Sequence, residues 1–422
     1  MPTPTAHATH TAHTTHASTR ARLTAAAAAG AMLMAAGLFS AAAAGASTGP
    51  HRASGAALRS ALRRDISHYL TARRKAEHIS AVSLRVTFRG GRPAISLATG
   101  TTRYDGGPPA STRALWQIGS NTKAFTAVIL LQLEAEGKLS ISDPIGKWLP
   151  QYPAWRHVTI KQLLNMTSGI ADYAAQPAFG AALAANPRTR FTAARLVSYA
   201  AGQPLGPKGW AYSDTNYILA QMIIERVTRD SYTDQLTRRI IRPLGLRTLC
   251  DAPYTCPPAD AARIPAGYFY EPAAPPLLGK RVPSLALTWA QGAGGIVSSL
   301  ADMTTWDRAL YQGRELPPRQ QRQLESLVSQ ATGKPIRTTT LADPSGFGLG
   351  TAQLTTRPTG TAWYYQGGTL GYRVVHFYFP RSGIIIAIAA NSATDINTND
   401  DLPAAAIAVY RTLLKADATH SG

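Results

Sequence analysis

Apolar residues recur at helical spacing where the folded part of the chain begins. Across positions 56–76 they lie four apart, at Leu58, Leu62, Ile66 and Leu70, and this spacing predicts a helix with one buried face. Positions 82–88 alternate between apolar and other residues, a glycine pair follows at 90–91, and residues 94–97 form a second short run. Two short runs separated by a glycine turn predict a β-hairpin.

The rest of the chain divides into a helical middle and a strand-rich end. A strongly apolar stretch at 121–137 predicts a buried helix that stops at Gly137. Residues 139–280 are rich in Pro, Gly and Ala, which predicts short helices and loops. Three late apolar runs predict strands and precede a final predicted helix; they are 363–365, 372–379 and 383–390, followed by the helix at 403–414.

This order of elements favours an α+β fold. The hairpin and the late strands must share one antiparallel sheet flanked by the two terminal helices, while the middle forms a mainly helical lobe against it. We find no internal repeat. A cleft between the two lobes is the expected place for a functional site.

The first 46 residues have the composition of an export signal. Residues 1–22 contain no acidic side chain and end in a basic pair, an alanine-rich apolar run covers 23–44, and Ala44-Gly45-Ala46 completes an A-x-A step. These parts predict a secretory signal peptide cleaved after Ala46, with a retained membrane anchor as the alternative. We therefore expect a secreted protein without stable membrane insertion, with a flexible leader at 47–55, one domain at 56–415 and a tail at 416–422.

The charge is strongly unbalanced. The chain has 43 Lys and Arg against 23 Asp and Glu, a formal excess of 20 positive charges. Such a balance favours anionic surroundings. No basic helix with interleaved aromatic residues is present, so we expect no nucleic-acid partner. An anionic cell-wall polymer suits an exported protein better, and an arginine-rich surface without a partner is an equal alternative.

Only two cysteines occur, Cys250 and Cys256, with five residues between them. In an oxidising compartment two such cysteines can close a small loop. A metal site would need further ligands nearby, and the sequence offers none. The pattern favours a structural disulfide and predicts no metal.

The candidate chemistry begins with Ser120 and Lys123. A serine hydroxyl is a weak nucleophile until a neighbouring base activates it, and three residues of helix place both side chains on one face. Ser-x-x-Lys occurs once in the chain and leads into the apolar stretch at 121–137, which favours a buried lysine. An N-capping serine beside an exposed lysine is the alternative. The predicted domain at 56–415 contains no Gly-x-Ser-x-Gly elbow.

Two further motifs follow in order. They are Tyr212-Ser213-Asp214, which precedes a helical run, and Tyr365-Gln366-Gly367, which leads into Gly368. Together with Ser-x-x-Lys and with the supporting segments 163–170, 243–246 and 289–295, they resemble the serine β-lactamase and D-alanyl-D-alanine carboxypeptidase superfamily in its class C-like branch. That superfamily shows Ser-x-x-Lys, Tyr-x-Asn and Lys- or His-Thr-Gly. The resemblance covers about residues 55–415.

The resemblance implies a role for each matching residue. Ser120 would form the acyl-enzyme, Lys123 would take its proton, and Tyr212 would carry a proton to the leaving group, either as a phenolate or through Lys123. The backbone N–H groups of Ser120 and Gly368 would form the oxyanion hole. The neighbouring residues of the second and third motifs would contact substrate; these are Asp214, Tyr365, Gln366 and Gly367.

The second motif departs from the pattern at Asp214, where the superfamily has asparagine. A carboxylate beside Lys123 should raise the pKa of the lysine, which would shift proton transfer onto Tyr212 and leave Lys123 as electrostatic support. Alternatively, Asp214 points away and Asn216 contacts substrate.

The third motif departs at Tyr365, which replaces the cation that normally helps to hold a substrate carboxylate. Arg373 could supply that charge or could face solvent. The change weakens the peptidase interpretation without altering the acylating residues.

The expected function is an exported serine hydrolase without metal or organic cofactor. A D-alanyl-D-alanine carboxypeptidase-like activity on peptidoglycan-type peptides leads, with an esterase or β-lactamase of the same fold as the first alternative, acting on a small ester or amide. A catalytically silent cell-wall-binding homologue is the alternative from another class. Asp214, Tyr365 and the basic charge support that last hypothesis.

Overall fold

The structure is a computed structural model, and it describes residues 55–252, 254–270, 277–393 and 401–418. The predicted signal peptide and most of the predicted leader and tail lie outside these residues. None of the helices in the described ranges is long and apolar enough to cross a membrane.

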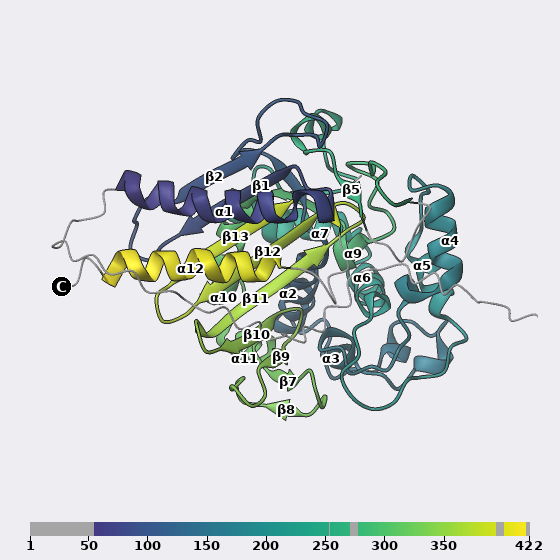
Figure 1. Cartoon of the computed structure of the whole chain (residues 1–422). Coiled ribbons are helices and arrows are strands. Elements are labelled where there is room, and N and C mark those ends of the chain that lie inside the picture. The colour runs from purple at the N-terminus through teal and green to yellow at the C-terminus, as the bar shows by residue number, and fades with distance from the viewer. Residues whose placement is uncertain (1–54, 253, 271–276, 394–400, 419–422) are drawn as a thin grey trace, which may run out of the picture.

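A nine-stranded antiparallel sheet forms the centre of the molecule (Figure 1). Its strands, in spatial order, are β2 (Ile95–Gly100), β1 (Ala81–Thr87), β13 (Ile384–Ala390), β12 (Arg373–Phe379), β11 (Gly360–Gly368), β10 (Ala352–Thr356), β9 (Ser345–Phe347), β7 (Leu327–Ser329) and β8 (Pro335–Ile336). Every residue of β12 and β13 is buried, which explains their nearly continuous apolar sequence. The hairpin from the start of the chain therefore pairs with strands from its end.

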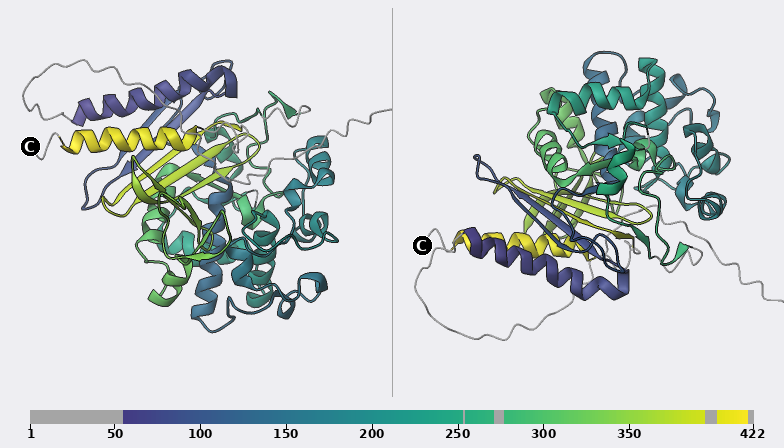
Figure 2. Two further views of the ribbon diagram at one scale, coloured as in Figure 1. Left: turned by 60° about the horizontal axis from the view of Figure 1, so that its bottom comes forward. Right: turned by 90° about the horizontal axis from the view of Figure 1, so that it is seen from above.

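The two terminal helices cover one face of this sheet. Helix α1 (Gly55–Glu77) and helix α12 (Leu402–Ala418) lie side by side there, as both views of Figure 2 show. Helix α10 (Leu300–Tyr311) and the helical lobe cover the other face. Leu62 and Ile66 of α1 are fully buried, as the spacing of the first apolar stretch predicts.

The helical lobe is built from the middle of the chain. Its helices are α2 (Thr122–Ala135), α3 (Ile160–Leu164), α4 (Pro177–Ala185), α5 (Ala193–Ala200), α6 (Asp214–Thr228), α7 (Tyr232–Leu236), α8 (Arg242–Leu244) and α9 (Gln291–Gly294), with α11 (Pro318–Leu324) beside α2. Short helical turns connect them: η2 (Ile145–Lys147), η3 (Pro153–Trp155), η4 (Tyr173–Ala175), η5 (Thr237–Ile241) and η6 (Pro258–Arg263). The predicted α+β architecture with a mainly helical lobe is confirmed.

Two small sheets complete the fold. One contains β3 (Leu115–Gln117), β6 (Ile296–Ser299) and β4 (Cys250–Asp251), and the other pairs β5 (Tyr268–Phe269) with β14 (Ser392–Ala393) in parallel. Cys250, the first residue of β4, forms a disulfide with Cys256. These short strands, together with α10 and β7–β10, are elements that the apolar pattern of the sequence did not predict.

Candidate active site

A tight turn places Ser120 between the sheet and the helical lobe. The turn η1 (Gly119–Asn121) runs directly into α2, so Ser120 lies one turn ahead of the helix rather than inside it. Gly119 has φ of 53°, a conformation that suits glycine. A Cβ atom on Gly367 would lie 1.9 Å from the carbonyl oxygen of Ile118. Both glycines are therefore needed for β11 to pack against the turn.

This packing positions the two amides that the resemblance assigns to the oxyanion hole. Thr369 N donates to Tyr372 O across the hairpin. Because N–H groups alternate in direction along an antiparallel strand, the amide of Gly368 faces the other edge, where Ser120 lies. Their role in stabilising an oxyanion stays a prediction.

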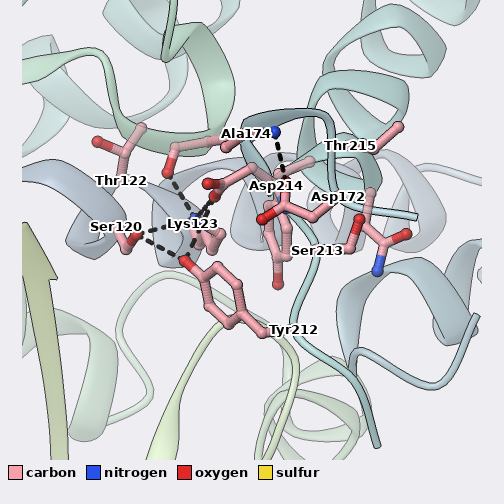
Figure 3. Close-up of polar contacts among 12 residues, drawn as sticks. Ser120, Thr122, Lys123, Asp172, Ala174, Tyr212, Ser213, Asp214 and Thr215 are labelled. Carbon is pink, nitrogen blue, oxygen red and sulfur yellow. Dashed lines mark hydrogen bonds and ion pairs between the residues drawn. The ribbon is translucent and has the colours of Figure 1, made fainter. Parts of the chain in front are cut away.

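Three side chains gather around the Ser120 hydroxyl (Figure 3). Tyr212 Oη lies 2.6 Å from Ser120 Oγ, and Lys123 Nζ lies 3.0 Å from the same oxygen. Asp214 Oδ1 accepts from both neighbours, at 2.5 Å from Lys123 Nζ and 3.3 Å from Tyr212 Oη. The structure thus brings together the four residues that the first two motifs singled out.

Lys123 is fully buried, so the alternative of an N-capping serine beside an exposed lysine is wrong. Its other hydrogen-bond acceptor is the carbonyl oxygen of Ala293 at 2.8 Å. Asp214 Oδ1 and Ala293 O each accept a hydrogen bond from Lys123 Nζ, because neither oxygen can donate one. The remaining hydrogen-bonding position of Lys123 Nζ faces Ser120 Oγ. There the nitrogen donates a hydrogen bond if it is an ammonium group and accepts one if it is a neutral amine.

Asp214 acts on the pKa of Lys123 in the expected direction, but burial outweighs it. Burial lowers the pKa of Lys123 below its ordinary value, and the negative charge of Asp214 only opposes that change. The net direction is therefore opposite to the predicted one, because desolvation of the buried ammonium outweighs its attraction to one carboxylate. A lowered pKa is the change that a general base at this position requires.

The pKa of Tyr212 is shifted in the opposite direction to that of Lys123. Burial, reinforced by the charge of Asp214, raises the pKa of Tyr212 well above its usual value. The hydroxyl of Ser120 opposes this only partly. A resting phenolate is disfavoured, so the neutral phenol is the form that lies beside Ser120. A neutral phenol can donate a proton to a leaving group.

Asp172 is a site residue that the sequence reasoning missed. Its Oδ1 accepts the backbone N–H groups of Asp214 and Ala174, each at 3.1 Å. Burial and the neighbouring Asp214 raise the pKa of Asp172 well above its usual value, against these two donors. The residue lies just after segment 163–170, which the resemblance had already marked, so its position offered a signal.

Asn216 does not have the alternative role proposed for it. The side chain is completely buried and accepts from Ser168 Oγ at 2.7 Å. Asp214 points to Lys123, so the alternative in which Asp214 turns away and Asn216 contacts substrate is wrong.

The third motif lies on β11, beside the turn that holds Ser120. Tyr365 packs edge-on against Phe347, with ring centroids 5.7 Å apart, and its hydroxyl is buried. Burial, and secondly the charge of Asp214, raises the pKa of Tyr365 well above its usual value. Gln366 is partly exposed. A neutral tyrosine therefore stands where the superfamily has a cation.

Arg373 supplies no replacement for that cation. It is completely buried, forms an ion pair with Glu77 and donates from Nε to the carbonyl oxygen of Ser392 at 2.8 Å. Both predicted roles, a substrate-binding charge and a solvent-facing side chain, are wrong. The arginine instead joins the start of β12 to the end of α1.

A buried histidine holds the nucleophile turn. His376 Nδ1 lies 2.9 Å from Asn121 Oδ1, and its Nε2 lies 2.8 Å from Tyr311 Oη. The Asn121 amide donates to the carbonyl oxygens of Ile118 and Val374, so its oxygen accepts and the histidine Nδ1 donates. Burial lowers the pKa of His376 to about 3. A neutral histidine therefore fixes the residue next to Ser120.

Among the described residues, no three His, Cys, Asp or Glu side chains are grouped to hold a metal ion.

With this geometry in view, comparison with known proteins identifies the family. The family described as Beta-lactamase matches residues 66–410. The chain belongs to the beta-lactamase family. The resemblance inferred from the three motifs is confirmed, and with it membership of a family of serine hydrolases.

Curated relatives of this beta-lactamase family member include two penicillin-binding proteins of Bacillus subtilis (strain 168). Penicillin-binding protein 4* is 31% identical over 216 residues, covering 48% of this chain and 46% of that protein. Putative penicillin-binding protein PbpX is 30% identical over 203 residues, covering 47% and 46%. The match thus spans about half the length of these relatives.

Two solved structures share the fold over most of this chain. A D-stereospecific amidohydrolase from Streptomyces sp. is 26% identical with a TM-score of 0.66, covering 83% of this chain and 97% of that one. The D-amino acid amidase from Ochrobactrum anthropi SV3, complexed with D-phenylalanine, has a TM-score of 0.71 at 22% identity, covering 85% and 99%. At that identity the second likeness shows the fold alone.

Proposed function

We propose that this protein hydrolyses small amides or esters through an acyl-enzyme on Ser120. The observation that carries this proposal is the contact of the Ser120 hydroxyl with Lys123 Nζ and Tyr212 Oη, at 3.0 and 2.6 Å. A nucleophile, a base of lowered pKa and a neutral proton donor within hydrogen-bond reach are the parts that acyl transfer requires.

The steps follow from these contacts. Ser120 Oγ bonds to the substrate carbonyl carbon while its proton passes to the neutral amine of Lys123. Tyr212 donates its proton to the departing nitrogen or oxygen as the C–N or C–O bond breaks, and the proton held by Lys123 restores Tyr212. A water molecule then attacks the acyl carbon with Lys123 as base, and Ser120 leaves with a proton.

The charges around Ser120 favour a substrate that needs no free carboxylate. Tyr365 carries no positive charge, and Arg373 forms an ion pair with Glu77. Asp214 and Asp172 add carboxyl groups on the lobe side of the site. The solved D-stereospecific amidohydrolase offers a precedent of amide hydrolysis on this fold.

A D-alanyl-D-alanine carboxypeptidase-like activity is the second candidate, supported by the penicillin-binding relatives. A pair of substrates separates the two: a D-alanyl peptide with a free carboxyl end and the same peptide with its end amidated. The proposed function predicts kcat/KM for the amidated peptide at least equal to that for the free acid. A preference of about tenfold or more for the free acid would favour the carboxypeptidase.

We also propose that the protein acts outside the cytoplasm, near an anionic cell-wall polymer. The apolar segment that precedes Ala46 and the excess of 20 positive charges support this. A surface pocket is lined by residues of segments 102–114 and 261–266 and by Arg281. Its lining includes no acidic residue and four arginines, which are Arg103, Arg113, Arg263 and Arg281. Sequencing the N-terminus of the protein recovered from the culture medium tests the export.

A further inference from the structure

A cavity in the helical lobe shares no lining residue with the cluster around Ser120. It has a volume of about 550 Å³ and is lined by α6, α7, β4 and the first residue of α9. That volume is in the usual range of small-molecule sites. Its wall contains two acidic side chains, Asp251 and Glu225, that the proposed hydrolysis does not use.

Asp251 lines this cavity and has one oxygen with no partner among the described residues. The residue is 2% exposed. Its Oδ2 accepts from Thr233 Oγ1 at 2.5 Å, whereas Oδ1 is buried without a hydrogen bond to any described residue. A buried acceptor of this kind costs free energy until a donor satisfies it. This oxygen belongs to a residue in the wall of a cavity that can admit a ligand.

Glu225 is the second carboxyl group of the cavity. Its Oε1 accepts from Gln221 Nε2 at 3.1 Å and from the backbone N–H of Tyr232 at 3.3 Å. Within the described residues, neither Glu225 nor Asp251 forms an ion pair with a basic side chain. Arg190 also lines the cavity and is exposed to solvent. The interior therefore carries acidic groups without a compensating cation.

We propose that this cavity binds a small organic ammonium compound, with the ammonium group between Asp251 and Glu225. An ammonium group needs only three acceptors, whereas a calcium ion takes six to eight oxygen ligands. The oxygens of Gln221 and Gln291 already accept hydrogen bonds from Gly292 N and Gln221 Nε2. The apolar part of the ligand would contact the rings of Phe191, Tyr232 and Tyr254, which line the same cavity.

Helix α9 lies between the cavity and Lys123. Gln291 lines it, Gly292 N donates to Gln221 Oε1 at 2.8 Å, and Ala293 O accepts from Lys123 Nζ at 2.8 Å. A ligand that moves α9 would therefore move an acceptor of Lys123. The binding itself does not rest on the proposed hydrolysis.

Isothermal titration calorimetry of the mature protein with benzylamine tests this site, with benzyl alcohol as the uncharged match. We expect benzylamine to bind, benzyl alcohol not to bind, and Asp251→Asn to weaken benzylamine binding by about 30-fold or more, as loss of a buried charge partner does. Glu315→Gln is the matched control, because burial likewise raises the pKa of that carboxyl to about 7 and it lies outside the cavity. It should leave the affinity unchanged.

Affinity should also rise with pH. Burial raises the pKa of Asp251 to about 7, so its charge appears as the pH rises through that value while the amine stays protonated. The other titratable or charged groups around it are Glu225 on α6, Tyr232 on α7, and Tyr254 and Arg190 in loops. Of these, Glu225 also has a raised pKa because of burial, and its ionisation acts in the same direction.

Three results would overturn the proposal: no binding of benzylamine to the wild type, equal binding of benzyl alcohol, or equal affinity in Asp251→Asn. Circular dichroism checks that the variant folds. If Asp251→Asn does not fold, Glu225→Gln decides in its place, and affinity equal to that of the wild type would overturn the proposal.

Discussion

Lys123 Nζ lies 2.5 Å from Asp214 Oδ1, and both side chains are buried. The second motif thus has a carboxylate in contact with the lysine at the position where the superfamily has asparagine. Burial lowers the pKa of Lys123, and Asp214 acts against it. The carboxylate therefore raises the pH at which the buried lysine becomes a base.

Replacing Asp214 by asparagine should move the acid limb of the pH–rate profile. Activity needs the neutral amine, so kcat/KM rises as the pH rises through the pKa of Lys123. Because the charge of Asp214 raises that pKa, Asp214→Asn should lower it by about 1–3 units. The acid limb of kcat/KM against pH, measured with a p-nitrophenyl ester, should shift to lower pH by the same amount.

The opposite assignment gives a different profile. If Asp214 were the terminal base and received the Ser120 proton through Tyr212, Asp214→Asn would lose about 10²- to 10⁴-fold in kcat/KM at every pH. A uniform loss without a shift would contradict the role of Lys123 as base.

Tyr212→Phe tests the proton donor. The variant keeps the ring beside Lys123 but has no proton for the leaving group, so kcat for an amide should fall by about 10²- to 10⁴-fold. A p-nitrophenyl ester, whose leaving group needs no protonation, should lose much less. Parallel kinetics on the two substrates measure this difference.

Tyr217→Phe is the matched control for that experiment. Tyr217 is also buried beside Lys123, but its hydroxyl donates to the carbonyl oxygen of Leu164 at 2.7 Å. We expect a loss of about 1–3 kcal/mol in the free energy of unfolding, from the acceptor left unsatisfied, and little change in kcat. Equal losses on amide and ester in Tyr212→Phe would argue against its role as an acid.

The sequence was sufficient to predict most of the architecture. The spacing of Leu58 to Leu70 predicted α1, and the apolar runs before Ala390 predicted β12 and β13 nearly to the residue. Helix α1 buries one face, and β12 and β13 are buried on both faces, so their apolar residues form a clear pattern in the sequence. Strands such as β8 and β9 have two or three residues, too few for any period to be visible.

The site was only partly predictable for a different reason. Ser120, Lys123 and Tyr212 belong to local motifs whose spacing survives in the sequence. The partners of Arg373 and His376 lie 296 and 255 residues away, at Glu77 and Asn121, and no local pattern marks such pairs. The pKa of Lys123 depends on how completely it is buried, which the motif alone does not give.

Tyr365→Lys should change the preference for a substrate carboxylate. The substitution restores a cation at the third motif, and a charged hydrogen bond contributes about 1.5–3 kcal/mol. We expect the ratio of kcat/KM for the free-acid peptide to that for the amidated peptide to rise by about tenfold or more. Tyr365→Phe, which removes the hydroxyl without adding charge, should leave the ratio unchanged. An unchanged ratio in the lysine variant would show that another group governs this preference.

Arg373→Met should affect stability rather than substrate binding. Removing one partner of a buried ion pair costs about 3 kcal/mol or more in the free energy of unfolding, measured by urea denaturation. The exposed Arg59, replaced by methionine, should change it by less than about 0.5 kcal/mol. In the folded variant the ratio for free-acid and amidated peptides should stay constant. A selective loss of activity on the free acid would restore Arg373 as a substrate-binding charge.

The acyl-enzyme on Ser120 can be observed directly. The mature protein is mixed with a p-nitrophenyl ester, quenched rapidly in acid, and analysed by intact-mass and peptide-mapping mass spectrometry beside Ser120→Ala. We expect one added acyl group on the peptide that contains Ser120 and none in the variant. A folded wild-type protein that carries no adduct, or carries it on another residue, would contradict the serine-hydrolase mechanism and favour a catalytically silent binding protein.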